Sequence, residues 1–227
     1  GPILYGAKKL GMHIHTRYEV SNNAGQDICD IVNNEGFDFL LVGSGISMSD
    51  SPDDIAATRY RTSFYNRYFK RFKAPESWFY PGALLKDKTK MFIARSNCDV
   101  GVFINRNFVK ATNTLVVISS EEDLFLLDYT RTLLKATHGS VGIVAKMSTT
   151  TPGHDQILKE LWDFVSSTPQ TQLLPDKDLT PGLFNSYNFM LIGYNTWNDV
   201  SEHRKEALQK MPSTLILNKN KRSSSDN

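Results

Sequence analysis

The stretch FDFLLVGSG at residues 37–45 places an apolar run directly before two glycines. A run of this kind that ends in glycine is typical of a strand buried on both faces of a parallel sheet. The stretch YNFMLIG at residues 187–193 repeats the same order of one aromatic, one polar, one aromatic and three aliphatic residues before a glycine. Two copies of one strand pattern in a chain of 227 residues indicate two related units.

The rest of the chain alternates between strand-like and helix-like patterns. Buried-strand patterns also occur at residues 99–106, 114–120, 140–146 and 213–218, and helical patterns at residues 24–35, 121–136 and 155–166. Strands that alternate with helices predict right-handed crossovers and mostly parallel sheets. We therefore predict an α/β, Rossmann-like fold built from two units.

The repeat also sets the expected boundaries. We predict a first unit at residues 1–110 with an insertion at 46–85, a second unit at 111–220 and a disordered tail at 221–227. Each unit closes on a similar tetrapeptide, INRN at 104–107 and LNKN at 217–220, which aligns Ile104 with Leu217. Only about ten residues precede an alternating strand pattern at 12–20, which leaves no room for an opening strand and helix. We therefore expect a first unit that is truncated at its N-terminus.

Composition and charge exclude several function classes. The 26 basic and 24 acidic side chains nearly balance, so no overall field favours nucleic acid as a partner. The only two cysteines, Cys29 and Cys98, lack the spacing of a zinc site or a disulfide framework, which favours a reducing compartment. No apolar run approaches the length that spans a bilayer.

Catalytic signatures are missing from the sequence. The five histidines are scattered, and neither a nucleophile elbow nor a Walker-type phosphate loop occurs. The acidic pair Glu121 and Glu122 precedes an aliphatic run, where capping of a helix start explains it. We therefore expect a chain that is not an enzyme and that holds no metal.

A nucleotide site without catalysis stays open at the first glycine turn. Beyond the carboxyl end of a strand, a glycine turn lets backbone amides point at phosphate. The candidate residues are Gly43, Ser44 and Gly45, with Lys86 and Lys88 as nearby cations. A lone Gly-x-Gly also simply ends many strands, so this turn by itself predicts a ligand only weakly.

The insertion contains a basic aromatic segment at residues 59–73. It carries six basic side chains, six aromatic rings and no acidic residue, and helical spacing places most rings opposite most cations. One interpretation packs the aromatic face on the sheet or on a second subunit. Another lays the helix on an anionic membrane surface. The candidate contact residues are Arg59, Phe64, Arg67, Tyr68, Lys70, Phe72 and Lys73.

Two segments resemble the cytosolic tail of monovalent cation/proton exchangers. The segment SNCDVGVFINR at residues 96–106 is similar to the Ala-Pro-Cys-Ser-Val-Gly-Ile-Leu-Val-Asp-Arg segment of the plant members. The segment VVISSEED at residues 116–123 is similar to the strand and acidic helix start that follow it there. The resemblance covers residues 11–220 apart from the insertion. In detail, the amino-acid sequence is more similar to that of the fungal potassium/proton antiporters than to that of the plant members.

This resemblance implies a tail with two universal-stress-protein-like halves. It also implies an upstream transmembrane antiporter domain in the same chain, on an intracellular organelle, with this part on the cytosolic face. We therefore expect a non-enzymatic regulatory domain that forms a homodimer. Transport residues would lie in the membrane domain, so none is assigned here.

The nucleotide pattern of universal stress proteins is altered in this sequence. That pattern is Gly-x-x-Gly, about nine residues, then Gly-Ser or Gly-Thr at the start of the helix before the last strand. Ile46 replaces the second glycine, Lys86 precedes an aspartate at the expected Gly-Ser position, and Asp199 stands at that position in the second unit. An aspartate at a helix start would repel phosphate. We therefore expect no cofactor, and keep an adenine-nucleotide sensor as the alternative.

Overall fold

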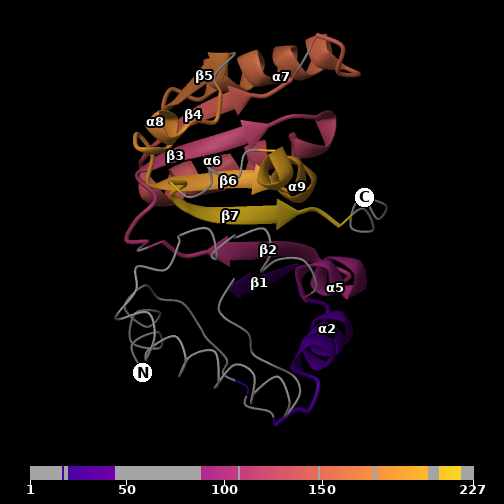
Figure 1. Cartoon of the computed structure of the whole chain (residues 1–227). Helices are drawn as coiled ribbons and strands as arrows, with labels where there is room; N and C mark the ends of the chain where they lie inside the picture. The colour runs from indigo at the N-terminus through magenta and orange to yellow at the C-terminus, as the bar shows by residue number, and fades with distance from the viewer. Residues whose placement is uncertain are drawn as a thin grey trace.

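The computed structural model describes residues 17, 20–43, 88–106, 108–147, 149–175, 178–203 and 210–220. Within them lies one seven-stranded sheet with the strand order β1-β2-β7-β6-β3-β4-β5 (Figure 1). The strands are β1 (Phe39–Gly43), β2 (Asp99–Ile104), β3 (Asn113–Ile118), β4 (Ser140–Ala145), β5 (Thr171–Pro175), β6 (Phe189–Gly193) and β7 (Ser213–Asn218). All neighbours pair in parallel except β2 and β7, which pair antiparallel. The fold is therefore α/β with a mostly parallel sheet, as predicted.

Helices cover both faces of this sheet. They are α2 (Ala24–Glu35), α5 (Lys88–Arg95), α6 (Leu126–Thr137), α7 (His154–Ser167), α8 (Pro181–Phe184) and α9 (Tyr194–His203), with the 3₁₀ turn η2 (Glu121–Asp123). The buried side chains of α2, α5, α8 and α9 join one core cluster, and those of α6 and α7 join the other. None of the helices in the described ranges is long and apolar enough to cross a membrane.

The antiparallel pair β2–β7 divides the sheet into two directions. The arrowheads of β2 and β7 point opposite ways in Figure 1. The carboxyl ends of β1 and β2 therefore lie at the edge of the sheet opposite to those of β3, β6 and β7. Gly43 and Gly193, which end the two copies of the repeated strand, consequently lie at opposite edges.

Two matched hydrogen bonds join the strands at this seam. Asp99 lies opposite Phe39 in the β1–β2 register, as Ser213 lies opposite Phe189 in the β6–β7 register. The Asp99 Oδ1 accepts from the backbone N–H of Asn220 at 2.8 Å. The Ser213 Oγ accepts from the backbone N–H of Arg106 at 2.8 Å. The donors Arg106 and Asn220 each lie two residues beyond the end of their own strand, β2 and β7. The two strands at the seam are therefore related by an approximate two-fold axis.

Local sequence accounts for the ends of the elements. Asn23 caps α2 by accepting from the backbone N–H of Gln26 at 3.4 Å, and Gly36 ends the helix with φ +67°, where a side chain would be strained. Ser120 and Asp123 form the capping box of η2.

The predicted strands at 37–43, 99–106, 114–120, 140–146, 187–193 and 213–218 and helices at 24–35, 121–136 and 155–166 are confirmed to within a few residues. The register corrects one detail. Phe103 lies opposite Gly43 as Leu217 lies opposite Gly193, so the equivalent of Leu217 is Phe103, one residue before the Ile104 of the tetrapeptide alignment. The division into two units stays a prediction. The described part of the first unit contains α2, β1, α5 and β2. Most of the predicted strand 12–20, the insertion and the tail 221–227 lie outside the described residues.

Candidate functional site

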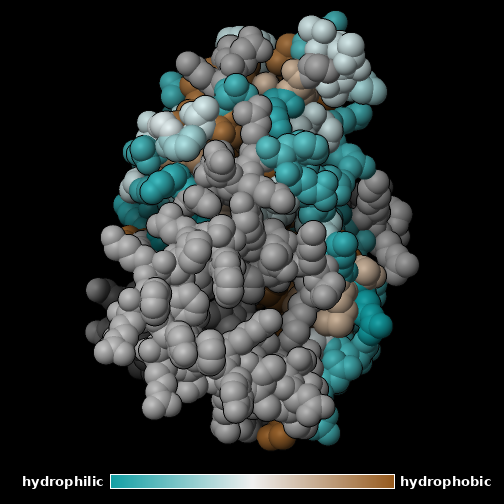
Figure 2. Space-filling view, in the orientation of Figure 1, coloured by the Kyte–Doolittle hydropathy of each residue, from teal (hydrophilic) through white to brown (hydrophobic). Residues whose placement is uncertain are grey.

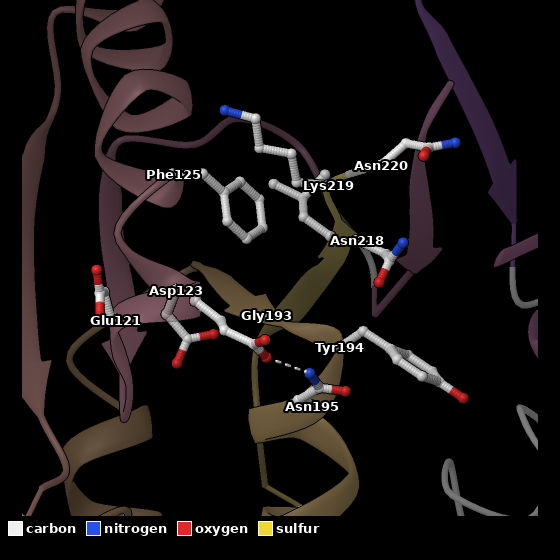
Figure 3. Close-up of a pocket in the computed structure, with 11 residues that line it drawn as sticks. Glu121, Asp123, Phe125, Gly193, Tyr194, Asn195, Asn218, Lys219 and Asn220 are labelled. Atoms are coloured by element: carbon white, nitrogen blue, oxygen red, sulfur yellow. Dashed lines mark hydrogen bonds between the residues drawn. The ribbon is translucent and has the colours of Figure 1, made fainter. Parts of the chain in front are cut away.

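A pocket of about 300 Å³ opens at the carboxyl ends of β3, β6 and β7. Strand order runs outward from β3 to β4 on one side and from β3 to β6 on the other, so β3 and β6 form the switch point where open α/β sheets place ligands. Figure 3 shows the side chains that converge there from η2, from the start of α9 and from the end of β7. The lining residues are Glu121, Glu122, Asp123, Phe125, Gly193, Tyr194, Asn195, Leu217, Asn218, Lys219 and Asn220.

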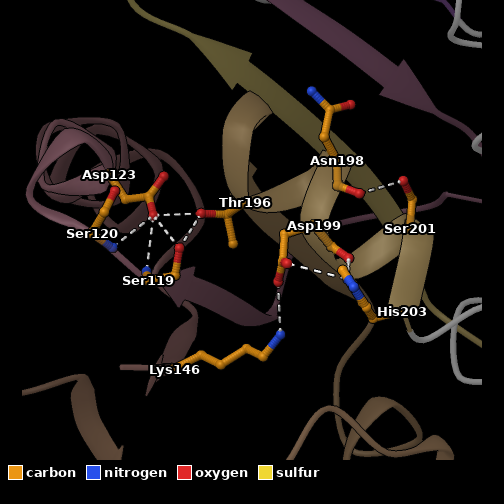
Figure 4. A network of polar contacts seen from close by, with 9 residues as sticks. All are labelled: Ser119, Ser120, Asp123, Lys146, Thr196, Asn198, Asp199, Ser201 and His203. Atoms are coloured by element: carbon orange, nitrogen blue, oxygen red, sulfur yellow. Dashed lines mark hydrogen bonds and ion pairs between the residues drawn. The ribbon is translucent and has the colours of Figure 1, made fainter. Parts of the chain in front are cut away.

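Asp123 is the buried polar centre of this site. Its side chain is 2% exposed. The Oδ2 atom accepts from the backbone N–H of Ser119 at 2.8 Å, from that of Ser120 at 3.2 Å and from the hydroxyl of Thr196 at 2.6 Å (Figure 4). The Ser119 hydroxyl donates to the same atom at 3.2 Å. Loop, 3₁₀ turn and α9 are thus held together by one carboxylate.

Gly193 makes the close approach of that carboxylate to β6 feasible. A Cβ atom added to Gly193 would lie 1.9 Å from the Oδ1 of Asp123, far inside van der Waals contact. Helix α9 begins at the next residue, Tyr194, so no glycine loop separates strand and helix. Asn195, in the first turn of α9, donates to Oε2 of Glu122 at 2.8 Å. The N-terminus of α9 therefore faces carboxylates of its own chain.

The pocket also contacts the seam between β2 and β7. Phe125 packs edge-on against Tyr129, with ring centroids 6.0 Å apart. The hydroxyl of Tyr129 donates to Oδ2 of Asp99 at 2.8 Å, and the other oxygen of Asp99 accepts from the pocket residue Asn220. Burial and the hydrogen bond to Asp99 raise the pKa of Tyr129 well above its usual range. A ligand between Phe125 and Asn220 would therefore touch one donor to Asp99 directly, Asn220, and would reach the other, Tyr129, only through the ring of Phe125.

Asp199 does not occupy the start of a helix as predicted. It lies in the second turn of α9, where its carboxylate pairs with Lys146 at 3.2 Å and with His203 at 3.2 Å (Figure 4). The prediction that Asp199 occupies the anion position of the second unit is therefore wrong, because α9 starts directly after β6. The carboxylates at that helix start are Glu122 and Asp123.

The sequence-predicted nucleotide site lies elsewhere. Gly43 ends β1 at the opposite edge from the pocket and is exposed. Ser44, Gly45 and Lys86 lie outside the described residues, and of Lys88 only the backbone is described, as the first residue of α5. Whether these five residues form one site therefore stays a prediction.

The structure does not test the predicted membrane-contact residues. All of the membrane-contact candidates between residues 59 and 73 lie outside the described ranges, so that hypothesis stays a prediction. Among the residues that the structure describes, no group of three or more His, Cys, Asp or Glu side chains could hold a metal ion. On the face turned to the viewer in Figure 2, hydrophilic side chains predominate over the upper, described part, with apolar residues scattered among them.

The sequence placed Gly193 at the end of a buried strand but did not predict this pocket. The sequence explained Glu121 and Glu122 as capping residues, and Lys219 with Asn220 as the end of the closing tetrapeptide of the second unit. Asp123 carried one usable signal, the Ser-x-x-Asp spacing from Ser120, which predicts a side chain turned back to the backbone. That spacing does not reveal contact with Thr196.

Comparisons with known proteins show the fold. No protein-family model matches the chain, and no curated protein matches it. A universal stress protein from Archaeoglobus fulgidus DSM 4304 is similar in structure, with a TM-score of 0.52, 10% identity and coverage of 96% of this chain and 75% of that one. A functionally unknown protein from Pseudomonas aeruginosa PAO1 has the same TM-score and identity, with coverage of 96% and 76%. The chain therefore has a universal-stress-protein-like α/β fold.

Proposed function

We propose that this chain is the cytosolic regulatory domain of a membrane potassium or sodium/proton antiporter, with no catalysis of its own. The observation that carries the proposal is where the two antiporter-like segments lie. Residues 96–106 supply β2 at the seam, and residues 116–123 supply the end of β3 and the acidic wall of the pocket. The two segments that resemble the antiporter tails thus form part of the seam and part of the pocket. Seam and pocket are in contact through the hydrogen bond from Asn220 to Asp99.

Regulation would operate through this contact between pocket and seam. A ligand, or a loop of the membrane part, that binds beside Phe125 and Asn220 would change the packing around Asp99. Any difference in its affinity for two arrangements of the seam would shift the equilibrium between two states of the attached transporter. The domain would act by binding energy alone, on the cytosolic face of an organelle membrane.

Two related units and a homodimer are part of the same proposal. The matched bonds of Asp99 and Ser213 support the two-unit organisation, because equivalent strands then meet across an approximate two-fold axis. Strand β1 supports the dimer. It reads FLLVG, without the charged residues or proline that protect a free sheet edge, and in the described residues only β2 pairs with it. A second copy would cover that edge.

An adenine-nucleotide sensor is the competing function. It is favoured by the position of the pocket at the switch point of the sheet, where α/β folds bind nucleotides. It is disfavoured by the carboxylates that face the N-terminus of α9, because a phosphate would be placed against like charge.

The test uses the complete gene product. Its reading frame should encode membrane-spanning segments, and after reconstitution into vesicles an imposed potassium or sodium gradient should drive proton flux. Lys219→Glu, at the exposed rim of the pocket, should change that flux by at least about five-fold, which is the lower end of typical allosteric coupling. Lys159→Glu, on the exposed face of α7, is the matched control and should leave it unchanged.

Two outcomes would overturn the proposal. A gene product without membrane segments, or one that exchanges no cation for protons, removes the antiporter. Exchange that is equal in wild type, Lys219→Glu and Lys159→Glu removes the regulatory role of the pocket.

A further inference from the structure

The carboxylate of Asp123 occupies an arrangement of donors that suits a phosphate group. Two successive backbone N–H groups, from Ser119 and Ser120, point at one oxygen after the end of β3. The hydroxyl of Thr196 in the first turn of α9 adds a third donor at 2.6 Å. Consecutive backbone N–H groups and a helix N-terminus are the features with which α/β folds hold anions.

Gly193 leaves the space that the carboxylate needs on its other side. The Oδ1 atom of Asp123 lies so close to Gly193 that any side chain there would collide with it. Asp123 is almost fully buried, and both oxygens are in contact with protein atoms. The carboxylate is therefore a permanent part of the pocket wall.

We propose that Asp123 is a resident anion that takes the place of a phosphate, and that it restricts this pocket to uncharged or cationic ligands. The rest of the wall agrees with this selectivity. Among the described lining residues, Glu121 and Glu122 add two carboxylates against the single cation of Lys219. Phe125 and Tyr194 provide aromatic surface for an apolar body or for a cation. The inference concerns ligand chemistry and stands whether or not the chain regulates an antiporter.

The test removes the carboxylate and offers inorganic phosphate in its place. Asp123→Gly opens the position, whereas Asp123→Asn fills it with a neutral side chain of nearly the same shape. Thermal unfolding is followed for wild type and both variants in phosphate, and in sodium chloride at the same ionic strength. Phosphate stabilises many proteins by exclusion from their surface, and the wild type and Asp123→Asn measure that general effect.

Asp123→Gly should gain a Tm increase of about 3 to 6 °C over both controls at a phosphate concentration ten times its Kd. A phosphate response in the wild type as large as in Asp123→Gly would overturn the proposal. So would the absence of any extra response in Asp123→Gly.

A variant that fails to fold still gives an answer. Asp123→Gly would then be unfolded in denaturant and refolded by dilution into phosphate or into chloride of matched ionic strength. Recovery of folded protein in phosphate alone supports the resident anion. Equal recovery, or none, in the two salts contradicts it.

Discussion

Replacing Gly193 by alanine should destabilise the protein through Asp123. The added Cβ would lie 1.9 Å from Oδ1, and relief to 3.0 Å requires the carboxylate to move by more than 1 Å. Such a shift would stretch the 2.6 Å bond from Thr196 and the 2.8 Å bond from Ser119 beyond hydrogen-bond length. Overpacking costs about 1–3 kcal/mol, and a lost bond to a charged group about 1.5–3 kcal/mol.

The expected loss is about 3 kcal/mol of unfolding free energy, or about 6 to 12 °C in Tm for a chain of this size. Urea unfolding followed by circular dichroism measures it. Gly182→Ala in α8 is the matched control, because its Cβ would meet no atom closer than 3.9 Å. Alanine there should be neutral or stabilising by up to about 1 kcal/mol.

The double variant Gly193→Ala/Asp123→Gly makes the prediction specific. With the carboxylate gone, the alanine methyl has space, so the double variant should be less destabilised than the sum of the two single variants. Strict additivity would refute the reasoning, as would a Gly193→Ala variant as stable as the wild type.

Three further predictions concern the seam and the buried thiols. Asp99→Ala should lower the free energy of unfolding in urea by about 2–3 kcal/mol, because two donors at 2.8 Å lose their acceptor. The control Asp128→Ala loses one exposed ion pair and should cost below about 1 kcal/mol. Equal losses in the two variants would contradict the role of Asp99 in joining the strands at the seam. The raised pKa of Tyr129 means that folding favours its neutral form. The contribution of this hydroxyl to the free energy of unfolding is therefore complete below about pH 10 and is lost as the pH rises further. Stability above pH 10 should therefore fall less steeply in Tyr129→Phe than in wild type, and an unchanged slope counts against the buried hydroxyl. Cys29 and Cys98 are 0% and 4% exposed, and burial raises the pKa of both thiols. Iodoacetamide at pH 8 should therefore modify them at least about tenfold more slowly in the native protein than in urea. Equal rates would show that the thiols are accessible in the folded state.

The sheet could be predicted from the sequence because its strands are buried on both faces. β3 and β6 are continuous apolar runs, and such runs are visible without knowing their neighbours. β5 was missed, since the edge strand TQLLP is short and ends in proline. The antiparallel pairing of β2 with β7 was missed as well, because strand direction depends on contacts across more than one hundred residues.

The pocket was harder to predict than the sheet. Gly193 could be identified because a glycine after a buried strand marks the edge where ligands enter. Asp123 was not singled out as a site residue, although its spacing from Ser120 is that of a capping box and its carboxylate does accept from the backbone N–H of Ser120. Its contacts with Gly193 and Thr196 join residues that are far apart in sequence, and no local pattern records them.

The central claim is that this universal-stress-protein-like fold keeps the ligand crevice of the sheet and fills its phosphate position with Asp123. Calorimetric titration of ATP into the folded wild-type chain tests it most directly. The account predicts no heat of binding with ATP at 1 mM. A titration at this concentration detects binding down to a Kd of about 1 mM, which corresponds to a binding free energy of about −4 kcal/mol. Saturable binding of ATP to the wild type that is weakened by Lys219→Glu at the rim of the pocket would contradict it.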